Sequence, residues 1–173
     1  MFTSNAWNNN FSSDCRCNGV ESLSDRTTIT EKAMNLFQAA SGRAFVHRLW
    51  AFITRRPGRL LDLDQVTVCS VVQGSHSLGT HPVDIHQIRG TLGRTQDFDD
   101  QFNPLKERVR DRWKRVALAF LRGEALPAVE LVEVDGVYFV RDGHHRISVA
   151  RAMGREYIDA EVIQMYYQKR AVC

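Results

Sequence analysis

The chain has 173 residues, of which 43% are hydrophobic and 25% charged, so we expect one folded domain rather than extensive disorder. A net charge of +3 is too small to indicate nucleic-acid binding by itself. No apolar run reaches the roughly 18 residues of a membrane span, and the polar N-terminal sequence lacks a signal-peptide pattern. These features predict a cytoplasmic protein that does not contact membranes.

Residues 1–27 are rich in Asn, Ser and Asp and predict a mobile tail. A helix is predicted to begin at Thr28, because Thr28 and Glu31 fit a capping box. It should end at the Arg-Arg-Pro-Gly sequence of residues 55–58. Apolar side chains recur near helical spacing and are expected to face the core, namely Met34, Phe37, Phe45, Leu49, Trp50 and Phe52.

The next segments read as short strands and loops. β-branched residues between positions 60 and 72 predict one strand, and the glycines and proline of residues 73–82 predict a loop. Alternating residues 83–88 predict a short strand, and residues 90–94 predict a turn.

A longer helix is predicted over Pro104–Arg122, with Asn103 as its N-cap and Gly123 as its C-terminal stop. Its apolar residues form one stripe, which consists of Leu105, Val109, Trp113, Val116, Phe120 and Leu121. Trp113 is therefore expected in the core.

The C-terminal third predicts a hairpin, a helix and a strand. Residues 129–134 and 137–141 are joined by Asp135-Gly136, which favours a type I′ turn. A short helix should follow over His144–Met153, and residues 158–163 should form the last strand. We expect an α/β (α+β) fold in which helices flank a small mixed sheet.

Between the hairpin and the short helix lies the sequence Asp142-Gly143-His144-His145-Arg146. A helix start attracts anions through its unpaired N–H groups, and Gly143 would let a phosphate approach the backbone. Arg146 can donate two parallel hydrogen bonds to phosphate oxygens, and His144 and His145 add donors near neutral pH. The alternative is a plain connection in which Asp142 caps the helix and the other side chains are solvated or packed.

The run from Leu126 to Val162 resembles the ParB/sulfiredoxin-like superfamily, through Leu126-Pro127, residues 134–140, the Asp142–Arg146 loop, Ala150 and Gly154. This resemblance implies a nucleotide whose phosphates are held by Gly143, His144, His145 and Arg146. The loop is most similar to that of the free-serine kinase branch. Sulfiredoxins have a reactive cysteine where this chain has His144, and no glutamate stands near residues 88–94 to match the kinases' catalytic base.

An acidic cluster, Asp97-Phe98-Asp99-Asp100, follows Thr91 and Arg94. Carboxylates beside nucleotide phosphates hold Mg²⁺ or act as a base, whereas the alternative is an acidic loop before a basic helix. Candidate catalytic residues are therefore Asp97, Asp99, Asp142 and His145. Thr91 and Arg94 join the loop residues as candidate ligand-binding residues.

Two further patterns are read as structural. Basic residues along the predicted helix 104–122 suit a solvated face better than a nucleic-acid surface. His76, His81 and His86 are five residues apart, which does not match the spacing of helical metal ligands, and we predict no metal site from the sequence.

We therefore expect residues 28–173 to form one domain, with a helical arm and strand over residues 28–80 and a nucleotide-binding core over residues 81–173. It would bind a nucleotide (ATP, ADP or CTP, with Mg²⁺) or a phosphorylated small molecule, and would act, if catalytic, as a phosphotransferase or phosphohydrolase. The alternative is a non-catalytic ParB-like module that binds DNA or a protein, or a ParB-like nuclease. Either form is compatible with a dimer.

Overall fold

The computed structural model describes residues 23–54, 59–93 and 95–169. One mixed sheet has the strand order β1-β3-β5-β4-β6-β2. Its strands are β1 (Leu61–Asp62), β2 (Ser70–Asp84), β3 (Ile88–Thr91), β4 (Val129–Val134), β5 (Val137–Asp142) and β6 (Tyr157–Lys169). The helices are α1 (Leu23–Thr54), α2 (Leu63–Val66), α3 (Arg110–Leu121) and α4 (His144–Ala152). The predicted α/β fold, with helices flanking a mixed sheet, is confirmed.

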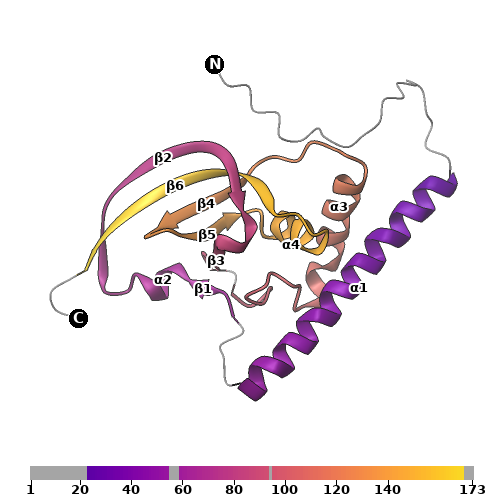
Figure 1. The fold of residues 1–173 in the computed structure, drawn as a ribbon, viewed down its shortest axis with the longest axis horizontal. Coiled ribbons are helices and arrows are strands. Elements are labelled where there is room, and N and C mark those ends of the chain that lie inside the picture. Colours follow the sequence, from indigo (N-terminus) through magenta and orange to yellow (C-terminus); the bar gives the residue numbers. More distant parts are fainter. Residues whose placement is uncertain (1–22, 55–58, 94, 170–173) are drawn as a thin grey trace.

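Short-range sequence signals explain the centre of the sheet. β4 and β5 pair antiparallel, and Asp135 and Gly136 both have positive φ (51° and 79°), as the predicted type I′ turn requires. β4 also pairs in parallel with β6, and β5 pairs in parallel with β3. β2 and β6 form a long antiparallel ladder that arches over one side of the molecule (Figure 1).

The main core lies between the sheet and the helices α1, α3 and α4. Trp113 of α3 is fully buried, as predicted, and its indole N–H donates to Ser148 Oγ of α4 at 2.8 Å. A smaller apolar cluster covers the other face of the sheet, where α2 contributes Leu63 against Val132 and Phe139. Burial on both faces is why the hairpin strands do not alternate cleanly between apolar and polar residues.

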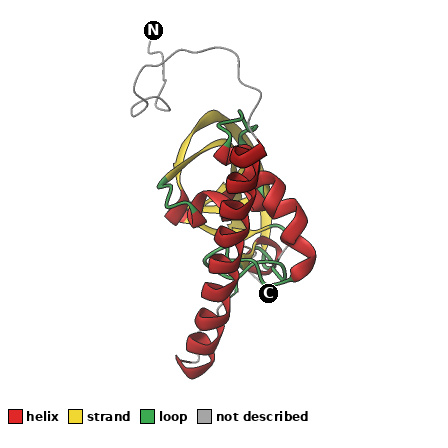
Figure 2. Ribbon diagram, turned by 90° about the vertical axis from the view of Figure 1, so that its right-hand side faces the viewer, coloured by secondary structure: helices red, strands yellow, loops and turns green. Residues whose placement is uncertain are grey.

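Helix α1 has two halves with different environments. Ala33, Phe37, Ala40 and Ala44 are buried, and the Phe37 ring meets Trp113 edge-on at 5.4 Å. The C-terminal half projects past the rest of the molecule (Figures 1 and 2). Four apolar residues predicted for the core are consequently exposed there, namely Phe45, Leu49, Trp50 and Phe52. Helical spacing identifies a possible buried face but not how far the partner surface extends.

The start of α1 also differs from the prediction. The helix begins at Leu23 rather than Thr28, so Thr28 is not its N-cap. Residues 1–22 of the predicted tail, and the predicted stop at residues 55–58, lie outside the described residues.

The predicted loop over residues 73–82 is wrong, because this segment belongs to β2. β2 is an edge strand, so Pro82 can occupy it without breaking a ladder on its free side. Gly74 and Gly79 coincide with shifts of register against β6, which are the irregularities where glycine is tolerated in a strand. The single strand predicted between residues 60 and 72 is divided instead. Leu61–Asp62 form β1, Leu63–Val66 form α2, and residues 70–72 begin β2.

The helix predicted over Pro104–Arg122 begins only at Arg110, after a 3-10 turn at Glu107–Val109. Pro104 instead makes an isolated β-bridge with Phe98. Asn103 is not a helix cap, since its side chain donates to Asp99 Oδ2 at 3.0 Å. The last strand also extends beyond the predicted residues 158–163, because its pairing with β2 continues to Lys169.

Among the described residues, none of the helices combines the length and the apolar character needed to cross a membrane.

The docking of α1 on α3 gives a stability prediction. Phe37→Ala should lower the free energy of unfolding by about 3–5 kcal/mol, because it removes a buried ring and leaves a cavity beside Trp113. Urea denaturation followed by circular dichroism measures this loss. Phe45→Ala, on the exposed half of the same helix, is the matched control and should change stability by less than about 0.5 kcal/mol. Equal effects of the two substitutions would contradict the docking.

Candidate functional site

The loop between β5 and α4 has a structural role in the fold. Gly143, not Asp142, is the N-cap of α4, and its φ of 98° lies in the left-handed region. A Cβ on Gly143 would come within 2.5 Å of the Val129 side chain. The glycine is therefore required by backbone conformation and by packing, and the expectation that Asp142 caps the helix is wrong.

Arg146 is largely buried and is held by the protein itself. Its guanidinium donates to the carbonyl oxygens of Pro127 and Ala128 and, at 2.7 Å, to Asp142 Oδ2. Only 13% of the side chain is exposed. Asp142 thus pairs with Arg146 across one helical turn. Phosphate binding by Arg146 stays a prediction, and it would require the guanidinium to exchange some of these hydrogen bonds.

Both histidines of the loop point into the interior. His144 is 3% exposed, and its Nε2 lies 2.5 Å from Oγ1 of the buried Thr91. The Phe98 ring stacks on the His144 ring and meets the His145 ring edge-on, with centroids 6.1 and 5.4 Å apart. The structure therefore brings together Thr91, His144 and His145, as the predicted site requires, but around an aromatic side chain.

The predicted acidic residues divide into two groups. Asp97 forms ion pairs with Arg108 and Lys106, which are the first basic residues between positions 104 and 122. Asp99 is fully buried, and its carboxylate accepts hydrogen bonds from the backbone N–H of Gln101 and Asn103 at 3.0 and 2.7 Å. Asp99 therefore closes the turn that follows Phe98. The catalytic roles proposed for these two residues stay predictions, and Arg94 lies outside the described residues.

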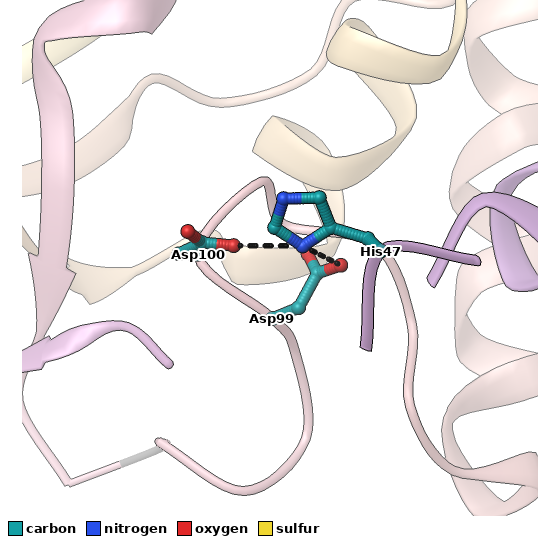
Figure 3. Close-up of side chains that lie close together, drawn as sticks. All are labelled: His47, Asp99 and Asp100. Carbon is teal, nitrogen blue, oxygen red and sulfur yellow. Dashed lines mark ion pairs between the residues drawn. The ribbon is translucent and has the colours of Figure 1, made fainter. Parts of the chain in front are cut away.

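A cluster that the sequence did not reveal lies beside Asp99. His47 of α1 places its Nδ1 3.7 Å from Asp99 Oδ2 and 3.3 Å from Asp100 Oδ1. Figure 3 shows this edge of the imidazole turned toward both carboxylates. The pKa of Asp100 is raised, mainly by burial and also by the charge of Asp99, while His47 opposes the rise. We call His47, Asp99 and Asp100 the acid–histidine cluster.

The same edge of α1 borders a groove with a volume of about 980 Å³. The lining residues come from α1, from the turn before α3, and from α4 and the segment after it. Basic side chains predominate among its ionisable lining residues, which are Arg43, His47, His86, Arg151, Arg155 and Glu156. Val46, Trp50 and Ala152 add apolar surface.

Arg151 lines the groove and also interacts electrostatically with Asp99 and Asp100 of the acid–histidine cluster. Its guanidinium donates to Ile85 O at 2.6 Å and lies over the Phe102 ring, 5.2 Å from the centroid. Burial lowers its pKa, the nearby Arg89 lowers it further, and Asp99 and Asp100 partly offset both effects. The positive charge of Arg151 is therefore compensated incompletely by the protein.

Sequence reasoning missed His47, Asp100 as a partner of His47, and the groove itself. His47 stands far from the acidic cluster in the chain, and nothing in its neighbourhood in the sequence marks it as a ligand. Spacings of three and four residues place Arg43, Val46, His47 and Trp50 on one face of a helix, but they do not place that face opposite Asp99.

Comparison with known proteins finds one solved structure that is similar to part of this chain. No protein-family model and no curated protein matches the chain. The crystal structure of sulfiredoxin from Arabidopsis thaliana is similar, with 20% sequence identity and a TM-score of 0.37. The similarity covers 48% of this chain and 82% of that one. The function proposed below therefore rests on the residues of this chain.

The bonding of Arg146 predicts a structural role that can be separated from ligand binding. Arg146→Lys should lower the free energy of unfolding by about 1–3 kcal/mol, because an ammonium cannot reproduce the planar set of bonds to two carbonyls and a carboxylate. Chemical denaturation measures this change. Arg141→Lys is the matched control, since Arg141 is half-exposed and pairs with Glu130 at 3.4 Å. Its effect should stay below about 0.5 kcal/mol.

Proposed function

We propose that the protein binds a phosphate-bearing small molecule, such as a nucleotide, in the groove between α1 and α4. The observation that carries this proposal is the basic wall of the groove. Arg43, Arg151 and Arg155 come from α1, α4 and the segment after α4, and Glu156 is the one acidic residue among the groove's described lining residues. Guanidinium groups converging on one cavity favour a ligand with several anionic oxygens.

The environment of Arg151 supports an anionic ligand in particular. A guanidinium that has lost part of its hydration and is repelled by the charge of Arg89 gains stability when a negative charge approaches. Its Nε atom is buried and has no hydrogen-bond acceptor among the described residues. A phosphate oxygen reaching the inner end of the groove would supply both the charge and an acceptor.

Trp50 supports a nucleotide over a smaller phosphate compound. Its side chain is 64% exposed although it lines the groove, which is an unusual position for so large an aromatic group. An exposed indole beside basic residues offers a stacking surface for a base. The groove volume lies at the upper end of the range that small-molecule sites occupy, so a nucleotide fits.

The proposed ligand is of the class predicted from the sequence, but its proposed site lies at the other end of α4. The sequence pointed to the N-terminal end of α4, where Arg146 is bound by the protein, whereas Arg151 stands in the helix's last turn. Phosphoryl transfer, hydrolysis and the use of Mg²⁺ remain proposals that depend on such a ligand.

DNA binding and nuclease activity remain predictions without added support. Several of the basic side chains between residues 104 and 122 have acidic partners. Arg108 pairs with Asp97, and Arg110 pairs with Glu107. These pairs reduce the positive charge available to a phosphate backbone.

Calorimetry with ATP, ADP, CTP, GTP and inorganic triphosphate tests the proposal. We expect ATP and triphosphate to bind, and Arg43→Ala or Arg155→Ala to weaken both by about 10- to 100-fold, the effect of losing a charge-assisted hydrogen bond. Trp50→Ala should weaken ATP alone, because triphosphate has no base to stack. Arg112→Ala, an exposed arginine on α3, is the matched control and should bind as the wild type does.

Two results would overturn the groove as the site. One is failure of every nucleotide and of triphosphate to bind at millimolar concentration. The other is wild-type affinity in both Arg43→Ala and Arg155→Ala. If Arg146→Lys abolished binding in a folded protein while those variants bound normally, the ligand would belong to the Asp142–Arg146 loop instead.

A further inference from the structure

We propose that the acid–histidine cluster is a binding site for one divalent cation of the first transition row, such as Mn²⁺. This inference goes beyond ligand binding in the groove and can be tested without any nucleotide. It rests on three ligand atoms, His47 Nδ1 and one carboxylate oxygen each from Asp99 and Asp100, that lie within 4.8 Å of one another.

The distances match those of atoms that share one metal ion. Ligands about 2.1 Å from a metal are separated by about 3.0–3.4 Å in octahedral or tetrahedral geometry. His47 Nδ1 lies 3.3 Å from Asp100 Oδ1 and 3.7 Å from Asp99 Oδ2. The two carboxylate oxygens lie within 4.8 Å of each other, and rotation about the side-chain bonds would bring the three atoms to a common distance from one cation.

Unsatisfied polar atoms give a second and independent indication. His47 Nδ1 and Asp100 Oδ1 are both buried, and neither has a hydrogen-bond partner among the described residues. Only an ion-pair contact at 3.3 Å joins these two atoms, and buried polar atoms without hydrogen bonds are costly, so a bridging cation would stabilise both. A cation satisfies a nitrogen and an oxygen lone pair at once.

The surrounding structure holds the ligands in place as metal sites require. Asp99 is fixed by the backbone N–H groups of Gln101 and Asn103 and by the Asn103 side chain, which leaves Oδ2 directed at His47. Hydrogen bonds of this kind orient a ligating carboxylate. His47 is carried by a helix whose preceding turn is buried at Ala44.

The ligand set selects the class of cation. One imidazole and two carboxylates suit Mn²⁺, Fe²⁺ or Zn²⁺ better than Mg²⁺ or Ca²⁺, which prefer oxygen alone. Three protein ligands leave coordination positions for water or a ligand oxygen. His47 also lines the groove, so on the proposed function a cation held by its imidazole would lie beside the bound phosphate.

Electron paramagnetic resonance of Mn²⁺, added to the full chain without nucleotide, tests the site. Free Mn²⁺ is counted directly, and Mn²⁺ binds thiols weakly, so the cysteines do not interfere. We expect one bound Mn²⁺ per chain, and at least about tenfold weaker binding in His47→Gln and Asp100→Asn. His76→Gln, an exposed histidine on β2 that belongs to neither the groove nor the cluster, is the matched control and should bind as the wild type does.

A measurement on the wild-type protein tests the site without relying on variants that could misfold. Substoichiometric Mn²⁺ should broaden the imidazole NMR signals of His47 well before those of His76 and His81, which lie on β2. The proposal is overturned if wild-type protein binds no Mn²⁺ at millimolar concentration, if folded His47→Gln and Asp100→Asn bind it normally, or if the His47 signals are unaffected. Since nucleotide is absent, none of these outcomes depends on the groove ligand.

Discussion

A carboxylate buried in the protein requires hydrogen-bond donors, and the turn around Asp99 supplies them. Asp99 is fully buried, and two backbone N–H groups and the Asn103 amide donate to it. These bonds fold residues 99–103 into a turn, which places Phe98 against His144 and His145 on one side. On its other side the carboxylate faces His47. One buried residue thereby joins the loop, α4 and α1.

Helix α1 contributes to both sides of this arrangement. Its buried residues are alanines and Phe37, between positions 33 and 44, whose small and flat side chains allow close approach to α3 and α4. Another face of the helix forms one wall of the groove through Arg43, His47 and Trp50. A helix buried along its whole length could not line a ligand site, and one exposed along its whole length could not hold His47 at the carboxylates.

Opposite charges lie close together where the groove meets the turn. Arg43, Arg151 and Arg155 give the groove a positive wall, while Asp99 and Asp100 place two carboxylates against His47, which also lines the groove. A phosphate compound bound with a divalent cation complements this distribution, because its anionic oxygens face guanidinium groups and its cation faces carboxylates. The groove ligand and the cation remain proposals, and each can fail without the other.

Local chemistry determined what the sequence alone could predict. Asp135-Gly136 favours a type I′ turn at any location, and the positive φ at Gly143 is available to glycine in any fold, so the hairpin and the start of α4 were predictable. Tertiary structure decided the rest. Arg146 is occupied because Pro127 and Ala128 happen to lie beside it, and His47 reaches Asp99 only because α1 docks on α3. Such contacts join residues far apart in the chain, and no local pattern encodes them.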